Sequence, residues 1–366
     1  MITLLISCEL IVDVDVPFKA NQLTANSFIN PDSLWFVQLN LNRNILDEEP
    51  FREINDARIV IFEDDNATDT LTNMGYGRFR SDNKTPEPGK TYTLSVSAPG
   101  YSDLQASTSI PFPCAITSVE VYESTSNQNS MLKVKLKDDG AEANYYELYM
   151  DLGNEYYNYD KKKMEFRRHR LQLISENPAI QNDNDSYSNS IIFKDLFFNG
   201  REVELTFKIP GTGFSRHGMV TITLRTLSED GYNYLRTALL QDMASGDPFA
   251  QPINVYNNIQ NGFGVFAGYS TSVYTKNKPK PVIYSIDPLT GKAGDHVIIT
   301  GENFIASPEA DANVVFPGTQ NPISGQILQL TPTRIEVIVP DMAVTGKIVI
   351  LSGRIAVSDS DFVITD

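Results

Sequence analysis

The sequence contains very little cysteine and histidine, which limits both its chemistry and its means of stabilisation. Only two cysteines, Cys8 and Cys114, and three histidines occur among 366 residues. Two cysteines cannot build a disulfide framework, so hydrophobic cores must stabilise the fold. No two histidines have metal-ligand spacing, and the Asp/Asn-rich segments 64–69 and 182–185 lack the glycine and glutamate of an EF-hand loop. Polar turns explain both segments, and we expect no metal and no cofactor.

The motifs of common catalytic classes are also missing. No Gly-x-Ser-x-Gly elbow is present. The tripeptide Gly89-Lys90-Thr91 resembles the end of a phosphate loop, but Lys84 stands where that loop requires glycine. We therefore predict that the protein is not an enzyme. A hydrolase is the least favoured alternative, because the fold alone would have to bring a histidine to a carboxylate and a nucleophile.

Positive charge and long hydrophobic runs are scarce as well. The formal net charge is −16, which removes the attraction to phosphate backbones and excludes nucleic acid as a partner. Beyond residue 8, no apolar stretch approaches the roughly 20 residues that a membrane-spanning helix needs. We therefore expect membrane attachment to use a lipid anchor instead of a spanning segment.

Cys8 is the candidate anchor. It closes the tetrad Leu5-Ile6-Ser7-Cys8 at the end of a short apolar run. An aliphatic and a small residue before cysteine are typical of the site that lipoprotein signal peptidase cleaves, after which the new N-terminal cysteine is acylated. We interpret 1–8 as the remnant of a signal peptide whose start lies upstream of Met1, and 9–25 as an acidic tether. The alternative is a buried free thiol.

Composition and turn spacing predict an all-β fold. Short runs of Val, Ile, Thr, Tyr and Phe alternate with polar residues, and Gly and Pro separate these runs at intervals of roughly 8–12 residues, which is typical of tandem β-sandwiches. One helix is expected at about 229–243. Ser228 would be its N-cap, and Glu229 and Asp230 would occupy its first turn.

The first two of three predicted domains cover 26–113 and 114–275. In the first, a Gly-aromatic strand, the Pro88-Gly89 turn, a Tyr-x-Leu strand and the Gly100-Tyr101 turn resemble the carboxypeptidase-regulatory, transthyretin-like sandwich. In the second, the strand pattern at 143–150 resembles fibronectin type III. A long polar insertion then interrupts this domain, which also contains the expected helix.

The third predicted domain is 281–366, after a linker rich in Lys and Pro. Its successive motifs are Val282-Ile283-Tyr284-Ser285-Ile286-Asp287-Pro288, Gly301-Glu302-Asn303-Phe304, Val314-Val315-Phe316-Pro317-Gly318 and a strand that Pro340 ends. Gly301 and Asn303 occupy the turn after the second strand. This succession resembles the IPT/TIG immunoglobulin-like domain, and the resemblance implies a third β-sandwich.

A second resemblance extends from Cys8 to about residue 275. The segments 192–201, 246–252 and 257–269 are similar to signatures of a Bacteroidota outer-membrane lipoprotein family, domain of unknown function 4249. The resemblance implies a lipoprotein on the cell surface, among outer-membrane systems built around TonB-dependent transporters, with no established catalytic activity. We therefore expect a non-catalytic accessory binding or scaffold subunit of such a transporter or of an assembly machinery.

The basic run at 161–170 is the candidate partner-docking site. Its six cations are Lys161, Lys162, Lys163, Arg167, Arg168 and Arg170. In so acidic a chain, the run is either a solvated hairpin or a surface whose charge accelerates association with an acidic partner.

Tyr156 and Tyr157 are candidate ligand-stacking residues, because exposed tyrosines present an apolar face with a polar tip. They motivate the alternative function, a module that captures glycan or peptide for nutrient uptake. Strand alternation offers another interpretation of this tyrosine-rich stretch. In that interpretation Tyr146, Leu148 and Met150 share a buried face. Tyr149 and Glu147 then point outward on the opposite face.

Overall fold

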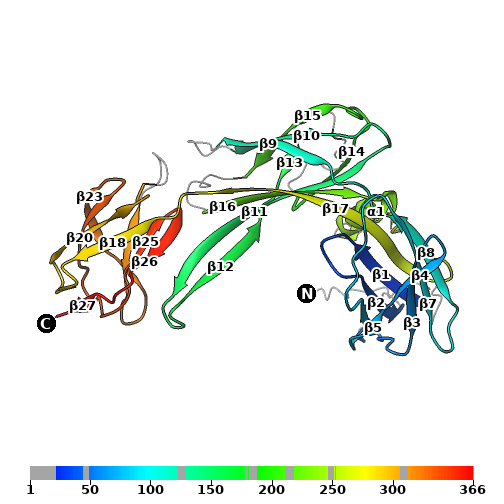
Figure 1. Cartoon of the computed structure of the whole chain (residues 1–366), viewed down its shortest axis with the longest axis horizontal. Helices are drawn as coiled ribbons and strands as arrows, with labels where there is room; N and C mark the ends of the chain where they lie inside the picture. The colour runs from blue at the N-terminus through cyan, green and yellow to red at the C-terminus, as the bar shows by residue number, and fades with distance from the viewer. Residues whose placement is uncertain are drawn as a thin grey trace, which may run out of the picture. The chain divides into compact units, whose positions relative to one another are not determined.

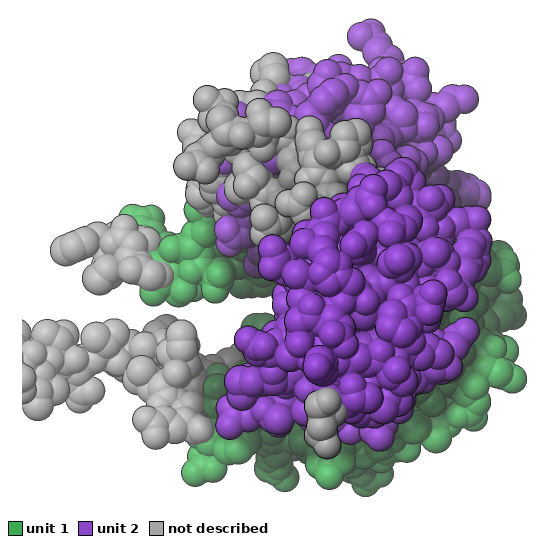
Figure 2. Space-filling model, turned by 90° about the vertical axis from the view of Figure 1, so that its left-hand side faces the viewer, with its two compact units in different colours: residues 1–110, 237–268 green, residues 111–236, 269–366 purple. Residues whose placement is uncertain are grey.

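The computed structural model describes residues 22–43, 49–122, 129–175, 177, 180, 188–210, 218–245, 251, 253–305 and 312–365. It confirms the all-β prediction: the elements are strands in several sheets, and α1 (Glu229–Ser245) is the one helix among these residues (Figure 1). The chain forms two compact units, one of residues 1–110 and 237–268 and the other of 111–236 and 269–366 (Figure 2). Cys8 lies outside the described residues, as does the Asp/Asn-rich segment 182–185.

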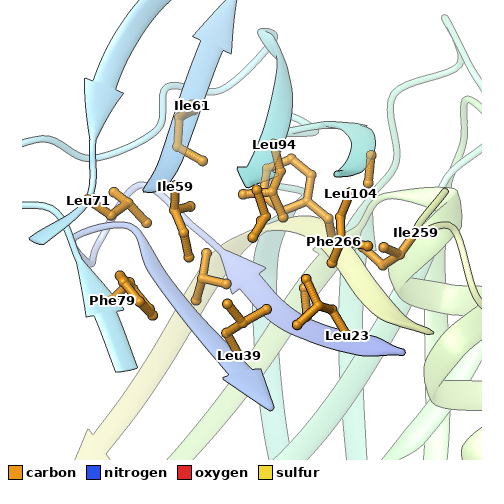
Figure 3. Close-up of a cluster of buried hydrophobic side chains, with 14 of the residues drawn as sticks. Leu23, Leu39, Ile59, Ile61, Leu71, Phe79, Leu94, Leu104, Ile259 and Phe266 are labelled. Atoms are coloured by element: carbon orange, nitrogen blue, oxygen red, sulfur yellow. The ribbon is translucent and has the colours of Figure 1, made fainter. Parts of the chain in front are cut away.

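Unit 1 is a β-sandwich with one apolar core. One sheet has the order β17-β1-β2-β6-β5, made of the first half of β17 (Phe263–Asn277), β1 (Leu23–Ile29), β2 (Phe36–Leu41), β6 (Arg78–Arg80) and β5 (Thr72–Asn73). The other has the order β4-β3-β7-β8, made of β4 (Asn66–Thr70), β3 (Arg58–Glu63), β7 (Thr91–Ser97) and β8 (Leu104–Ser109). Alternate apolar residues of both sheets point inward, and Figure 3 shows Leu39, Ile59, Leu94 and Phe266 among them. Trp35, the single tryptophan, is 1% exposed in this core.

Two boundaries of unit 1 differ from the sequence prediction. Strand β1 begins at Leu23, inside the predicted tether 9–25 and ahead of the predicted domain start at 26. Residues 237–268, which the sequence pattern predicts for the middle domain, belong to unit 1 because 263–268 pair in parallel with β1. Gly264 permits this pairing, since a Cβ atom there would lie 2.1 Å from the Ala25 carbonyl oxygen. A local sequence pattern can predict each strand, but it cannot predict that two strands so far apart in the sequence pair in parallel.

Unit 2 begins with a second sandwich. One sheet has the order β13-β15-β10-β9, made of β13 (Ile174–Ser175), β15 (Glu202–Ile209), β10 (Ser130–Lys137) and β9 (Ala115–Tyr122). The facing strands have the order β12-β11-β16-β17, made of β12 (Lys163–Arg170), β11 (Tyr145–Asn158), β16 (Met219–Leu227) and the second half of β17, and β14 (Ile191–Lys194) also pairs with β11. The core between them contains Tyr146, Leu148 and Met150, as alternation predicts.

Helix α1 begins where the sequence predicts. The Gly231 N–H donates to Ser228 Oγ at 3.1 Å, which is the N-cap bond that satisfies a first-turn donor. The helix ends at Ser245, two residues beyond the expected end. In the described part of the chain, no helix has both the length and the apolar character needed to cross a membrane.

The last part of unit 2 is a third sandwich with its own core, which includes Val297, Phe316 and Val337. Its sheets have the orders β18-β20-β24-β23 and β22-β21-β25-β26, beside the pair β19–β27. The strands are β18 (Val282–Asp287), β19 (Thr290–Gly291), β20 (His296–Glu302), β21 (Asn313–Phe316), β22 (Ile323–Ser324), β23 (Gln326–Leu330), β24 (Arg334–Ile338), β25 (Val349–Ser352), β26 (Arg354–Val357) and β27 (Val363–Ile364). Gly301 lies inside β20, paired with Ile283, instead of in the turn after this strand as predicted. A Cβ atom there would lie 1.9 Å from the Val282 carbonyl oxygen, so the close approach of β18 requires glycine.

Candidate functional site

The predicted docking and stacking residues lie together on the β11–β12 hairpin of unit 2. Strand β11 is buried from Tyr146 to Gly153 and only half-buried from Asn154 onward. It pairs with β12 from Asp151↔Arg170 to Asn158↔Lys163, and beyond Gly153, where its pairing with β16 ends, the two strands continue as a two-stranded ribbon. The first part of the predicted polar insertion is therefore an ordered hairpin. Its sequence is polar because it extends beyond the sandwich core.

Half of the basic residues are paired with carboxylates of the same hairpin. The Lys161 and Lys163 ammonium groups lie 2.9 and 3.8 Å from Glu165 Oε1. The Tyr156 hydroxyl also donates to Glu165. The Tyr156 hydrogen bond, followed by those from Lys161 and Asn158, lowers the pKa of Glu165 to about 2. Glu165 therefore remains charged at neutral pH and neutralises part of the basic run.

Arg170 belongs to a row of alternating cations and aromatic rings across four strands. Its Nε donates to Asp151 at 2.7 Å, and its guanidinium lies 3.6 Å from the centre of the Tyr149 ring. Arg225 lies 5.3 Å from the same ring and 4.6 Å from the Tyr269 ring. Such contacts attract because the ring face is electronegative. Tyr149 points outward, as predicted, yet the guanidinium groups leave it only 9% exposed.

Three basic residues of the hairpin remain without a carboxylate partner. No ion pair joins Lys162, Arg167 or Arg168 to an acidic side chain of the described residues. The Arg167 guanidinium instead covers the Tyr156 ring at 4.4 Å. Lys162 and Arg168 are exposed to solvent. The prediction of a basic docking surface thus reduces to these three cations.

The candidate stacking tyrosines are engaged within the hairpin. Arg167 occupies one face of Tyr156, whose hydroxyl is bound to Glu165. The Tyr157 ring meets the Tyr159 ring edge-on at 5.0 Å between centres. Stacking of Tyr156 and Tyr157 on a glycan therefore stays a prediction. Arg167 and Tyr159 already cover part of the surface of these two rings.

The hairpin also contacts the third sandwich, which the sequence did not reveal. Arg354 makes two hydrogen bonds to Glu155, of 2.6 and 3.2 Å. The Tyr159 hydroxyl lies 3.3 Å from the carbonyl oxygens of both Val315 and Lys347. Burial raises the pKa of Glu155, but the hydrogen bonds and charge of Arg354 outweigh it and hold this pKa below its ordinary value. No local sequence signal could join Glu155 to a residue 199 positions away.

Comparison with known proteins settles the family. The family model described as Domain of unknown function (DUF4249) matches residues 10–275, and the IPT/TIG domain model matches 281–363. The chain belongs to the DUF4249 family. In this DUF4249 protein the third sandwich is an IPT/TIG domain, and both results confirm the resemblances found in the sequence. No curated protein matches the chain.

Solved structures resemble this DUF4249 protein only distantly. A crystal structure with xylogluco-oligosaccharide shares 12% identity and a TM-score of 0.24, over 92% of this chain and 58% of that one. The extracellular region of plexin A4 (domains 1 to 8) shares 10% identity and a TM-score of 0.21, over 94% and 43%. A Salmonella alpha-2-macroglobulin mutant shares 8% identity and a TM-score of 0.21, over 95% and 23%. The chain thus spans less than two thirds of each of these structures, and such TM-scores do not establish a shared fold.

The described residues of this DUF4249 protein contain no group of three or more His, Cys, Asp or Glu side chains placed to hold a metal ion. Asp64 and Asp65 form the turn between β3 and β4, both with positive φ, as a two-residue hairpin turn requires. Burial raises the pKa of Cys114 to about 11, so its thiol is protonated at neutral pH.

Proposed function

We propose that this chain is a non-catalytic lipoprotein on the surface of the outer membrane. It serves as an accessory binding or scaffold subunit of a TonB-dependent transporter or of another outer-membrane complex. Cys8 carries the acyl chains, and the folded domains act by contact instead of by chemistry.

The β11–β12 hairpin is the observation that supports this proposal most directly. In a chain of net charge −16, it exposes Lys162, Arg167 and Arg168 without carboxylate partners among the described residues. Exposed charge of the sign opposite to that of a partner accelerates association and selects the partner. The contacts of Glu155 and Tyr159 with the TIG domain hold the hairpin in place. A charged surface on a fixed support suits the docking of a protein.

Lipidation of Cys8 is tested by the Cys8→Ser variant, expressed from the natural start of translation. We expect loss of palmitate labelling and release of the protein from membranes. The melting temperature should be unchanged, because we interpret residues 1–8 as a signal remnant that is not part of the folded domains. A variant that stays membrane-bound would place the anchor elsewhere.

The scaffold role is tested by crosslinking in intact cells followed by purification under denaturing conditions. We expect an outer-membrane barrel protein to be recovered with the wild-type chain and to be lost with the triple variant Lys162→Glu, Arg167→Glu, Arg168→Glu. The matched control is Lys292→Glu, an exposed cation in the TIG domain. Recovery of no barrel protein with the wild-type chain would refute the proposal.

A further inference from the structure

Strand β12 has two edges, and the described residues place a neighbouring strand along only one of them. It stands at the end of the order β12-β11-β16-β17, so β11 is its only strand neighbour among the described residues (Figure 1). Its eight residues, Lys163–Arg170, are exposed except for the half-buried Glu165. The backbone of an edge strand presents N–H and C=O groups that have no partner in the sheet. About half of these groups on β12 point away from β11.

The side chains along this edge differ from one end to the other. On one face Met164 and Phe166, 40% and 48% exposed, are followed by Arg168. Arg168 lies opposite Gly153, so no side chain at the paired position of β11 can neutralise it. Arg167 stands on the opposite face over Tyr156. An added strand would therefore meet two apolar side chains near one end and two cations without carboxylate partners near the other.

We infer that the free edge of β12 binds an extended acidic segment of a partner protein by β-strand addition. The segment forms main-chain hydrogen bonds with β12, as in other complexes that extend a sheet. Its apolar residues contact Met164 and Phe166, and its carboxylates contact Arg167 and Arg168. This inference rests on the proposed docking role and specifies its binding mode and the chemistry of the partner.

Charged residues on an edge strand have a second known effect, which is to prevent pairing between sheets. Three features of β12 favour recognition over protection. The charges are of one sign except for Glu165, which is neutralised by Lys161 and Lys163. The apolar pair Met164 and Phe166 is left exposed, which a merely protective edge would avoid. The contacts of Glu155 with Arg354 also fix the neighbouring strand β11, so the template is held in place before binding.

The test uses the full chain and a fluorescent ten-residue Val–Glu peptide, measured by anisotropy at low salt. Its first five residues are glutamate and its last five alternate Val and Thr, so that antiparallel pairing can place glutamates beside both Arg167 and Arg168 and valines beside Met164 and Phe166. Controls are the Val–Lys peptide and a Val–Glu peptide methylated at alternate backbone nitrogens, which removes the donors needed for pairing. We expect binding of the Val–Glu peptide alone. We also expect slower hydrogen exchange at alternate amides of β12, and affinity reduced about tenfold or more by Arg168→Glu but not by Lys292→Glu.

Each other outcome contradicts the inference in a defined way. Equal binding of the methylated peptide means that charge alone attracts it, without strand addition. If the peptide does not bind, or if hydrogen exchange in β12 is not slowed, the charges on this edge serve only to prevent pairing with other strands. If Arg168→Glu keeps its cellular crosslink to a barrel protein and the peptide does not bind, this inference fails while the scaffold role stands. If the wild-type chain gives no such crosslink, the scaffold role fails regardless of the peptide result.

Discussion

The two halves of β11 belong to one strand but are stabilised by different forces. From Tyr146 to Gly153 the strand is buried, and Leu148 and Met150 are fully enclosed in the second core. From Asn154 to Asn158 it is half-buried and is held by polar and aromatic contacts. The inner half forms part of the fold of the domain. The outer half supports a surface whose side chains can change without loss of the fold.

The largest expected effect is on the inner half. Leu148→Ala removes a side chain that is 0% exposed and leaves a cavity, so the free energy of unfolding should fall by about 2–5 kcal/mol. The matched control is Leu196→Ala, where the leucine is 67% exposed and the change should cost less than about 0.5 kcal/mol. Urea unfolding measures both. Equal losses would contradict the burial of this half.

A smaller effect is expected from the hydrogen bonds that join Tyr146, in the inner half, to Asp138. The buried Tyr146 hydroxyl donates to Asp138, which also accepts from the Gly200 N–H at 2.7 Å. Tyr146→Phe leaves the buried carboxylate with fewer donors and should lower the free energy of unfolding by about 1–3 kcal/mol. The control Tyr122→Phe removes a hydroxyl that donates to Glu120 at the surface, and it should cost less than about 0.5 kcal/mol. Similar losses of unfolding free energy in the two variants would mean that the buried Tyr146 hydroxyl contributes no more than the exposed Tyr122 hydroxyl.

The same contrast explains what the sequence could predict. The inner half alternates apolar and polar residues, so its strand character and its buried face were predictable from a local pattern. The outer half has no apolar period, so the sequence predicts only a polar insertion there, with a solvated hairpin as one interpretation of its basic run. The contacts of Glu155 with Arg354 and of β1 with 263–268 join distant positions, and no local pattern identifies their partners. The basic residues were found from composition, but their pairing with Glu165 and Asp151 required the fold.

Breaking the contact between the hairpin and the TIG domain tests how strongly this contact holds the outer half of β11. Arg354→Ala removes both hydrogen bonds to Glu155, two groups that are 28% and 22% exposed. The cost in unfolding free energy should be about 1 kcal/mol or less, because water competes for such groups. Trypsin should nevertheless cleave faster after Lys276, at the end of β17, whereas the bonds after Lys278 and Lys280 precede proline and resist the enzyme. The control Arg334→Ala breaks a pair with Glu336 and should leave linker cleavage unchanged.

Acid should weaken this contact in the wild-type chain. The pKa of Glu155 is below its ordinary value of 4.5 in the folded protein. A lowered pKa in the folded state means that the stabilisation is complete above the ordinary value and is lost as pH falls through the lowered one. Small-angle scattering should therefore report greater freedom of the TIG domain below about pH 4.5. Arg354→Ala should show that freedom at neutral pH and little further change with acid.

The smallest effect is expected at Lys161, in the turn of the hairpin. Its side chain is 60% exposed and lies 2.9 Å from Glu165, which retains Tyr156, Asn158 and Lys163 as partners after Lys161→Ala. Exposed ion pairs of this kind contribute little, so the free energy of unfolding should change by less than about 0.5 kcal/mol. Urea unfolding of Lys161→Ala and of Leu148→Ala under the same conditions measures the difference between their losses of unfolding free energy. A loss comparable to that of Leu148→Ala would mean that the outer half is part of the cooperative fold. Its charges would then be needed for stability and would not be available for binding.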